Sequence, residues 1–454
     1  MKRIISLLIA VLMLCALCVP ASADMAPGAI VRVYEGETIL YEKEDIWDIV
    51  FPEIKTKCES EWADKQSLEC VIDLSRDCTI FSLAECNYLP MPLTINLHGN
   101  LLELGHGDYW EFDHDLTING DGGRISTTHS GDEYNCCFWV DSGELTVSGV
   151  NVENMKTNMR YPVFATGDGC TSAKFTDCKF TNCSSSKYGG AICMEQTYKL
   201  TLTRCTFKNC SAQYGGAVYL EDFINGDRYV LVADKCTFES CKATDCGGAL
   251  YFYHNSTGEQ QDFSLKGITI NSCSADYGGA VYLDCYEASI TIAQAMSDSK
   301  GFIGSSYVDS KITNCSATYY GGAVYCNGEF VTVQFDGGQV DIVKSSEISD
   351  CSAQYGGGIF FNSESQYLYR ATIHDCKADE SGGAYYTEYP SDFVVNWCNF
   401  YGNTPADGNT ASVLSEGSVW IAAAVGAAAV LAVAAVVIVK KKKKPAAANG
   451  EGEE

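Results

Sequence analysis

The chain has 454 residues, of which 58 are acidic and 31 basic, and its formal net charge is −27 at pH 7. This balance excludes nucleic acid as an expected partner, because binding to the phosphate backbone requires clustered Lys and Arg. No Pro- or Ser-rich linker divides the body of the chain, so we expect one large domain rather than several.

Residues 1–23 have the pattern of a secretory signal peptide. Two basic residues precede an apolar run at 4–19, and Ala-Ser-Ala at 21–23 matches a signal-peptidase site. We therefore expect cleavage before Asp24 and an extracytoplasmic location for the residues that follow.

Residues 24–169 are rich in β-formers, but no regular repeat is visible there. Segments at 93–97 and 116–120 alternate apolar and polar residues and end at turn-forming residues. We interpret 24–169 as an N-terminal cap followed by divergent coils. A short helix at 60–68, with Trp62 facing inward, is expected to cover the open edge of the first coil.

Residues 170–412 contain a repeat that dominates the chain. Its unit is Phe or Ile, two residues, Cys, four or five residues, and then Gly-Gly before a short apolar strand. The pairs lie 26, 32, 31, 43, 35 and 26 residues apart and begin at Gly189, Gly215, Gly247, Gly278, Gly321, Gly356 and Gly382. A recurring unit of this size indicates a solenoid, in which each unit buries its apolar face only against its neighbours.

The composition of the unit distinguishes between kinds of solenoid. Runs of four to six β-forming residues alternate with Gly, Asn, Asp and Ser, and amphipathic runs long enough for helical repeats are missing. A unit of about 26 residues fits three short strands and three turns, with Gly-Gly where the backbone needs φ > 0 or has no room for a Cβ. We predict an all-β, right-handed parallel β-helix (a solenoid) of roughly twelve coils.

The segment at 420–439 consists of twenty uncharged, mostly apolar residues, and five lysines follow it directly. Twenty residues of helix span the ~30 Å hydrocarbon core of a bilayer, and lysines beside such a segment remain in the cytoplasm. We predict a C-terminal transmembrane helix at 420–439 and a lysine-rich cytoplasmic tail at 440–454. The protein would then be a single-pass protein of the cell membrane with an extracellular N-terminal ectodomain. A buried core helix is the alternative, but a β-solenoid offers no place for one.

Cysteine is frequent, with 22 of the 24 cysteines after residue 23. Disulfides are the first expectation for a secreted chain. However, two observations argue against disulfides. One column of the repeat holds Cys, Ile, Ser or Ala interchangeably, which a bridge would not tolerate. Stacked residues of adjacent coils also stand about 4.8 Å apart, whereas the Cβ atoms of a disulfide are about 3.8 Å apart. We interpret the cysteines as buried reduced thiols, with bridging as the alternative. The unbroken column contains Cys183, Cys210, Cys241, Cys273, Cys315, Cys351 and Cys376.

The repeat resembles those of the chlamydial polymorphic outer-membrane proteins and of adhesin-like right-handed β-helix proteins. Phe-Tyr-Gly-Asn at 400–403 and Gly-Gly-Ala-Ile at 189–192 match the residues of that family's repeat, and the resemblance covers 178–403. It places Cys183 and its counterparts where that family has a stacked asparagine, and it implies attachment to surfaces. The chain departs from the family at its C-terminus, so outer-membrane autotransport is not implied.

Alternate residues after each Gly-Gly face opposite sides of the strand. One set is apolar and is expected to face the core. The other set is predicted to point outward as a single aromatic file of Tyr219, Tyr251, Tyr282, Tyr325, Phe360 and Tyr386. A second outward file is predicted beside it, made of Glu221, Tyr253, Asp284, Asn327, Asn362 and Glu388.

Rings flanked by hydrogen-bonding groups suit a repeating polymer such as a glycan, so the aromatic file is the candidate ligand-binding site. The alternative is a structural role, in which the rings stabilise the sheet by stacking and insertions at 221–235 and 284–309 cover them.

Together these patterns predict a cell-surface anchored, adhesin-like protein that binds a surface glycan or a host protein. The alternative is a surface-anchored polysaccharide lyase or glycoside hydrolase on a β-helix scaffold. Because no carboxylate pair stands in a distinctive motif within the regular coils, we expect no enzyme, no catalytic residue and no cofactor. His98, His106 and His114 are equally spaced, but nothing near them completes a ligand set, so no metal site is predicted.

Overall fold

The chain divides into two compact units, Met1–Asn409 and Thr410–Glu454. The computed structural model describes only residues of the first unit, namely 28–45, 47–65, 67–80, 89–104, 110–127, 138–157, 160–197, 199–222, 230–254, 261–296, 307–336, 346–405 and 408. The predicted signal peptide (1–23), transmembrane helix (420–439) and tail (440–454) lie outside these residues. Within the described ranges, no helix has the length and apolarity needed to cross a bilayer.

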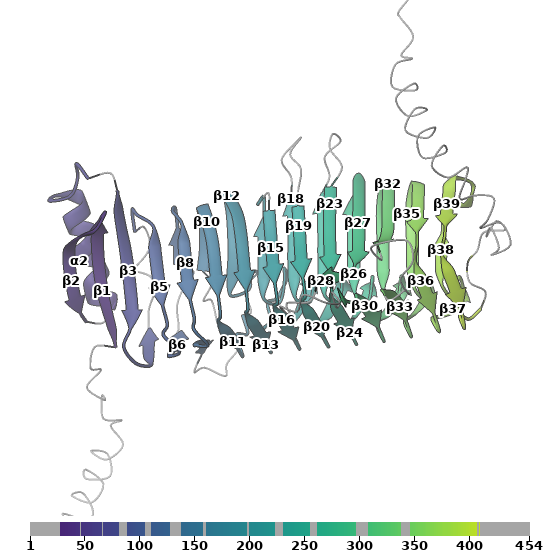
Figure 1. Cartoon of the computed structure of the whole chain (residues 1–454), viewed down its shortest axis with the longest axis horizontal. Coiled ribbons are helices and arrows are strands. Elements are labelled where there is room, and N and C mark those ends of the chain that lie inside the picture. Colours follow the sequence, from purple (N-terminus) through teal and green to yellow (C-terminus); the bar gives the residue numbers. More distant parts are fainter. Residues whose placement is uncertain are drawn as a thin grey trace, which may run out of the picture. The chain divides into compact units, whose positions relative to one another are not determined.

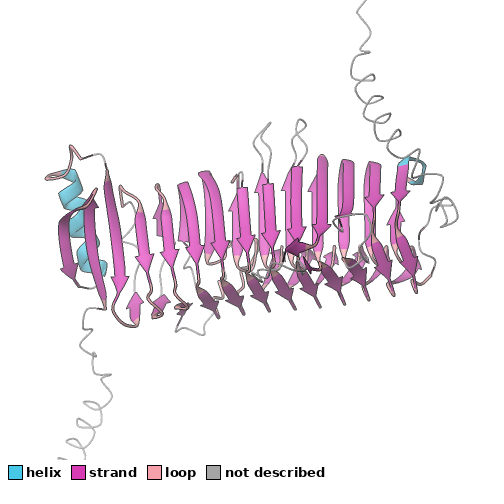
Figure 2. Ribbon diagram, in the orientation of Figure 1, coloured by secondary structure: helices cyan, strands magenta, loops and turns pink. Residues whose placement is uncertain are grey.

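The described residues form stacked coils built from three sheets, which we call A, B and C (Figures 1 and 2). Sheet A has 20 strands, sheet B 12 and sheet C 6. In a regular coil the chain passes from sheet A to sheet B, then to sheet C, and returns to sheet A after the Gly-Gly pair. The predicted parallel coil is confirmed with its three sides, but most repeat coils contribute two strands to sheet A, such as β18 (Val218–Asp222) and β19 (Val230–Asp234), so the expected three strands per coil is too few. The twelve strands of sheet B agree with the expected number of coils.

Sheet A contains the longest strands. Its members are β1 (Ala29–Glu35), β2 (Thr38–Glu44), β3 (Leu68–Leu74), β5 (Leu93–Asn96), β7 (Trp110–Phe112), β8 (Leu116–Asn119), β10 (Phe138–Ser148), β12 (Phe164–Thr176), β14 (Ile192–Glu195), β15 (Lys199–Thr203), β18 (Val218–Asp222), β19 (Val230–Asp234), β22 (Leu250–His254), β23 (Gln261–Lys266), β26 (Val281–Cys285), β27 (Glu287–Ala293), β32 (Val324–Asp336), β35 (Ile359–Tyr369), β38 (Tyr385–Thr387) and β39 (Phe393–Asn396).

Sheets B and C consist of short strands. Sheet B contains β4 (Cys78–Ile80), β6 (Leu101–Leu104), β9 (Arg124–Thr127), β11 (Asn151–Glu153), β13 (Lys179–Thr181), β16 (Thr206–Lys208), β20 (Thr237–Glu239), β24 (Thr269–Asn271), β30 (Lys311–Thr313), β33 (Glu347–Ser349), β36 (Thr372–His374) and β40 (Asn399–Tyr401). Sheet C contains β17 (Ser211–Tyr214), β21 (Lys242–Cys246), β25 (Ser274–Tyr277), β31 (Ser316–Tyr320), β34 (Ser352–Tyr355) and β37 (Lys377–Ser381). Outside these sheets lie α2 (Trp47–Glu59), the antiparallel pair β28 (Ala295–Met296) and β29 (Tyr307–Val308), and the 3-10 helix η1 (Pro390–Asp392).

The coils stack in the register of the repeat. Phe207 pairs with Phe180 of the preceding coil and with Phe238 of the next, and all three are buried. Their rings stack at 4.8 Å with planes within 4° of parallel. The same core column continues with Ile270, Ile312, Ile348 and Ile373.

A single residue with positive φ turns each repeat coil from sheet B toward sheet C. These residues have φ between 52° and 57° and are Asn182, Asn209, Ser240, Ser272, Asn314, Asp350 and Asp375. Asn and Asp tolerate this left-handed conformation best among residues with a side chain. The residue directly after each of them is the inward-facing cysteine of the unbroken column.

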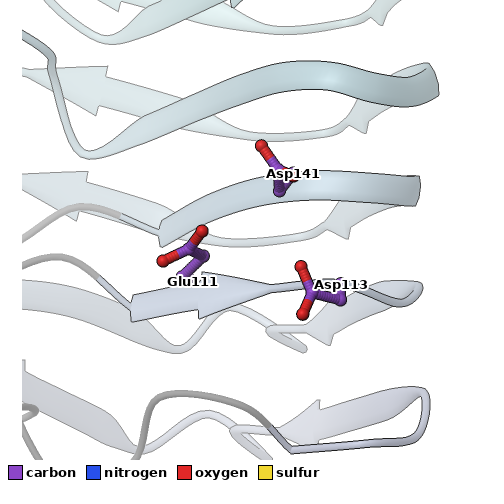
Figure 3. A group of neighbouring side chains, drawn as sticks. All are labelled: Glu111, Asp113 and Asp141. Atoms are coloured by element: carbon purple, nitrogen blue, oxygen red, sulfur yellow. The ribbon is translucent and has the colours of Figure 1, made fainter.

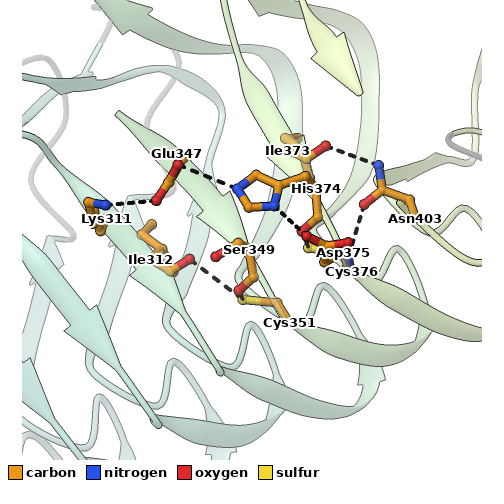
Figure 4. A network of polar contacts seen from close by, with 10 residues as sticks. All are labelled: Lys311, Ile312, Glu347, Ser349, Cys351, Ile373, His374, Asp375, Cys376 and Asn403. Carbon is orange, nitrogen blue, oxygen red and sulfur yellow. Dashed lines mark hydrogen bonds and ion pairs between the residues drawn. The ribbon is translucent and has the colours of Figure 1, made fainter. Parts of the chain in front are cut away.

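The cysteines of the unbroken column form no disulfide, and they are at most 1 % exposed. The one coil with asparagine at this position shows what the thiols replace: Asn403 donates from Nδ2 to the carbonyl of Ile373 at 3.0 Å and accepts the N–H of Cys376 at 3.0 Å (Figure 4). Likewise, the Cys351 thiol donates to the carbonyl of Ile312 at 3.8 Å. Six of the seven cysteines thus keep, more weakly, the bond that the amide makes to the preceding coil, whereas the thiol of Cys376 donates to the carbonyl of His374.

The N-terminal edge is covered, but not by the predicted element. Strand β1 runs antiparallel to β3 and β2, and α2 packs Val50, Phe51 and Ile54 into the core. The helix predicted at 60–68 is wrong: α2 ends before it, although Trp62 is buried as expected. Pro52 inside α2 hides this helix in the sequence, because proline normally marks a helix boundary.

Candidate ligand-binding face

The Gly-Gly pair at each corner fixes the orientation of the strand that follows it. Gly278 has φ +62°, and a Cβ there would overlap the carbonyl oxygen of Val281. A Cβ on Gly279 would overlap the carbonyl oxygen of Gly322 in the next coil. The pair therefore lets two coils touch through their backbones, and each following strand starts at the same height and with the same orientation.

The strands after these corners place the six predicted site residues in one file. Successive residues are paired in register, and their rings stack at 4.8–5.4 Å with interplanar angles of 1–11°. The residues that alternate with them are buried in the main core, as predicted. We call the aromatic file and the polar file beside it the tyrosine face.

A second file of tyrosines covers the first. These residues stand directly before the Gly-Gly corners and contact rings of the first file at 4.4–6.0 Å; they are Tyr188, Tyr214, Tyr277, Tyr320 and Tyr355. Consequently Tyr219 and Phe360 are only 2 % exposed, and the other four members are half-buried. The predicted register is correct, but the expected exposure is wrong at these two positions. The tyrosine directly before Gly-Gly is the sequence signal that could have predicted this burial.

The stacking determines which parts of the rings a ligand reaches. Each interior ring of the file has neighbours on both faces, so its edge and hydroxyl remain for an outside partner. Burial raises the pKa of Tyr325 to about 12 and that of Tyr282 still further, so both hydroxyls stay protonated at neutral pH. The face is therefore suited to hydrogen bonding rather than to stacking on sugar rings.

The polar file forms its own ladder. Asn362 donates from Nδ2 to Oδ1 of Asn327 at 2.8 Å, and Asn327 donates in turn to Asp284 at 2.6 Å. Burial raises the pKa of Asp284 above its usual value, and the bonds from Asn327 and Tyr282 only partly oppose this. At the other end of the file, the Tyr219 hydroxyl donates to Glu221, whose pKa burial also raises.

Replacing Asp284 with asparagine is expected to raise the thermal stability of the chain by a few degrees at pH 7. The folded chain holds the Asp284 proton more tightly than the unfolded chain, so this carboxyl makes stability fall as pH rises from 3.8 through the raised pKa. The amide that replaces the carboxyl would still accept the bond from Asn327, without a buried charge. Melting curves across pH check this: the gain should vanish below pH 3.8, and a variant less stable at pH 7 would contradict it.

The tyrosine face extends toward the N-terminus beyond the residues predicted from the repeat. In register, Tyr219 is followed by Cys193, Ala165, Trp139 and Glu111. The sequence concealed this because no Gly-Gly precedes the strands of Ala165, Trp139 and Glu111, and because Cys193, which does follow Gly189-Gly190, is not aromatic. The inserted segment expected at 284–309 also differs, since β27 within it is a regular strand paired with β23.

Three carboxylates gather at this N-terminal end (Figure 3). Oxygens of Glu111, Asp113 and Asp141 lie within 4.8 Å of one another. Burial raises the pKa of Glu111, and the charges of Asp141 and Asp113 add to the effect. The indole N–H of Trp139 donates to Asp141 at 3.2 Å. No other group of this kind occurs among the described residues, and none there includes a histidine.

A second acidic pair lies in the first two repeat coils, at the N-terminal end of the polar file. Glu195 and Glu221 are paired in adjacent coils, and the pKa of each is raised mainly by burial. Tyr161 donates to Glu195 at 3.0 Å, and the Arg160 guanidinium lies 3.8 Å from the same carboxylate and 4.6 Å from the centroid of the Tyr188 ring.

Stacked coils with three sheets, repeated corners and continuous core columns define a parallel β-helix repeat protein. The family described as "Right handed beta helix region" matches residues 116–294, which is less than half of the chain, and supports the right-handed sense. No curated protein and no solved structure matches the chain.

Proposed function

We propose that this is a cell-surface anchored, adhesin-like β-helix protein that binds an extended surface glycan along the tyrosine face. One observation carries the proposal: successive coils present tyrosine hydroxyls beside a ladder of amides and carboxylates, in register and about 4.8 Å apart. A polymer with repeating hydroxyl groups suits such a row of donors and acceptors.

The location is proposed from the sequence. The signal peptide at 1–23 directs export of the coils from the cytoplasm, and the apolar segment at 420–439 with its lysines anchors the chain in the membrane. The resemblance of the repeats to those of the chlamydial polymorphic outer-membrane proteins supports a role in attachment. The alternative ligand is a host protein.

The contacts are assigned to the half-buried members of the file. Tyr251, Tyr282, Tyr325 and Tyr386 offer hydroxyls and ring edges, whereas Tyr219 and Phe360 hold the stack together from beneath the second file. Asn327 and Asn362 offer the hydrogen-bonding capacity of their side-chain amides that remains free of bonds within the ladder.

Changing Tyr282 and Tyr325 together to phenylalanine is expected to weaken glycan binding about tenfold, through loss of two hydroxyls worth about 1 kcal/mol each before compensation. Ring stacking should persist, because Phe360 already occupies the same file. Binding is measured on glycan arrays and on cells. The matched control is Tyr367→Phe with Tyr369→Phe, which also removes two stacked hydroxyls from sheet A. Equal binding by both variants would contradict the proposal.

A glycan-active enzyme is the second candidate, because of the acidic cluster at the N-terminal end of the same face. Two carboxyl groups about 5 Å apart, one with a raised pKa, are the arrangement used in glycoside hydrolysis. Glu111 would be the acid, and Asp113 or Asp141 its partner.

In this case the wild-type chain should release reducing or unsaturated ends from a panel of glycans, and Glu111→Gln should reduce the rate at least a hundredfold. Glu153→Gln, on sheet B, is the control and should leave the rate unchanged. A wild-type chain without turnover would remove this candidate and leave the adhesin.

A further inference from the structure

The cysteine column is continuous over seven coils. Each cysteine follows a positive-φ corner residue, and the strands that lead into these corners are paired in register from β13 to β36. In the coil before Cys183 the same position is taken by Met155, which follows the positive-φ residue Asn154 and is 1 % exposed. Eight sulfur-bearing side chains therefore succeed one another at a single corner of the solenoid.

The thiols of this column reach toward the preceding coil. The Cys210 thiol donates to the carbonyl of Phe180 at 3.8 Å, and the Cys241 thiol donates to that of Phe207 at 3.6 Å. The side chains are closed off from solvent, and none forms a disulfide. Apolar side chains such as Val152 and Phe180, on the strands that lead into the corner, would fill the core equally well, so packing alone does not explain a row of sulfurs.

The spacing of the coils matches one kind of ligand. Two metal–thiolate bonds of about 2.3 Å laid end to end span about 4.6 Å, close to the ~4.8 Å between adjacent coils. Thiolate and thioether ligands select soft ions such as Cu(I). Zinc, in contrast, requires four ligands around one point, which a single file cannot provide.

We propose that the column binds a row of soft monovalent cations, Cu(I) or Ag(I), each held linearly between sulfurs of two adjacent coils. Each thiol releases one proton as its sulfur becomes a bridging thiolate. The seven thiols of the column enclose six such positions, and a seventh lies between Met155 and Cys183.

The charge of the filled column supports its burial. Six cations with seven thiolates leave one negative charge over the whole row, and the seventh cation beside the neutral thioether removes it. A buried row without net charge avoids most of the desolvation cost that isolated buried ions incur. Burial raises the pKa of Cys241 well above 9.0, so a cation that binds there has to displace its proton.

The test uses the full chain in detergent, kept anaerobic, with accessible thiols first alkylated in the native state. Silver ion alone is then titrated in, and bound metal is counted by mass spectrometry and released protons by a pH indicator. We expect six or seven Ag(I) and about seven protons per chain, with the strand signal in circular dichroism unchanged and the melting temperature raised. Absence of uptake, or uptake only as the strand signal is lost, would overturn the proposal.

A variant locates the ions. Cys273→Ser interrupts the column and should remove two of the bound ions, whereas Cys170→Ser, a buried cysteine outside the column, should remove none. If Cys273→Ser does not fold, X-ray absorption of the silver-loaded wild type decides: two sulfur neighbours per silver support the row, and oxygen or nitrogen neighbours refute it.

Discussion

Replacing Gly279 with alanine is expected to lower the free energy of unfolding by about 3 kcal/mol or more, beyond the usual cost of overpacking a core. The new Cβ would overlap the carbonyl oxygen of Gly322 and come within 2.6 Å of the carbonyl carbon of Ser316. Both groups belong to the backbone of the next coil, so no side-chain rotation relieves the clash. The two coils would have to separate, and the stack above and below them would be interrupted.

Denaturant unfolding, followed by circular dichroism, measures this loss. Gly36→Ala is the control: Gly36 also has positive φ (+58°), but no atom lies within 4 Å of the place where its Cβ would stand. Its cost should be the left-handed backbone penalty alone, about 1 kcal/mol. If both variants lose the same stability, contact between coils is not what the second glycine of the pair provides.

The fold could be predicted from the sequence because its main determinants recur. Each repeat unit contains Phe or Ile, a Cys three residues later, and Gly-Gly after four or five more, so a local pattern also specifies the contacts between coils. Where this repeat is missing, before residue 170, the sequence revealed strands but not their register. The cap helix α2 was missed for a local reason, because Pro52 interrupts an otherwise helical pattern.

The sequence could predict the register of the candidate face but not how deeply its residues are buried. Alternation along each strand separates inward from outward residues, and it placed Tyr282 and Tyr325 correctly in one file. Burial of that file depends on tyrosines across the corner, such as Tyr320 against Phe360, and alternation within one strand carries no information about them. The acidic cluster at Glu111 arises from two coils without a shared motif, so only the three-dimensional register brings it together.

Replacing Phe207 with alanine is expected to cost about 3–5 kcal/mol and to act locally. Its ring is fully buried and is stacked between Phe180 and Phe238, so the cavity would lie inside a column whose backbone spacing is fixed by the sheet ladder. Because each coil contacts only its neighbours, the coils around the cavity should open before distant ones.

Hydrogen exchange and thiol labelling, both read residue by residue by mass spectrometry, measure where the Phe207→Ala chain opens. Amides of β13, β16 and β20 should lose protection and Cys210 should become reactive, while Cys351, four coils away, stays shielded. Phe400→Ala, at a half-buried position in the last coil of sheet B, is the control and should cost less because its ring has a neighbouring coil on one side only among the described residues. Loss of protection spread evenly over all coils would show instead that the solenoid unfolds as a single cooperative unit, and the assignment of stability to contacts between neighbouring coils would fail.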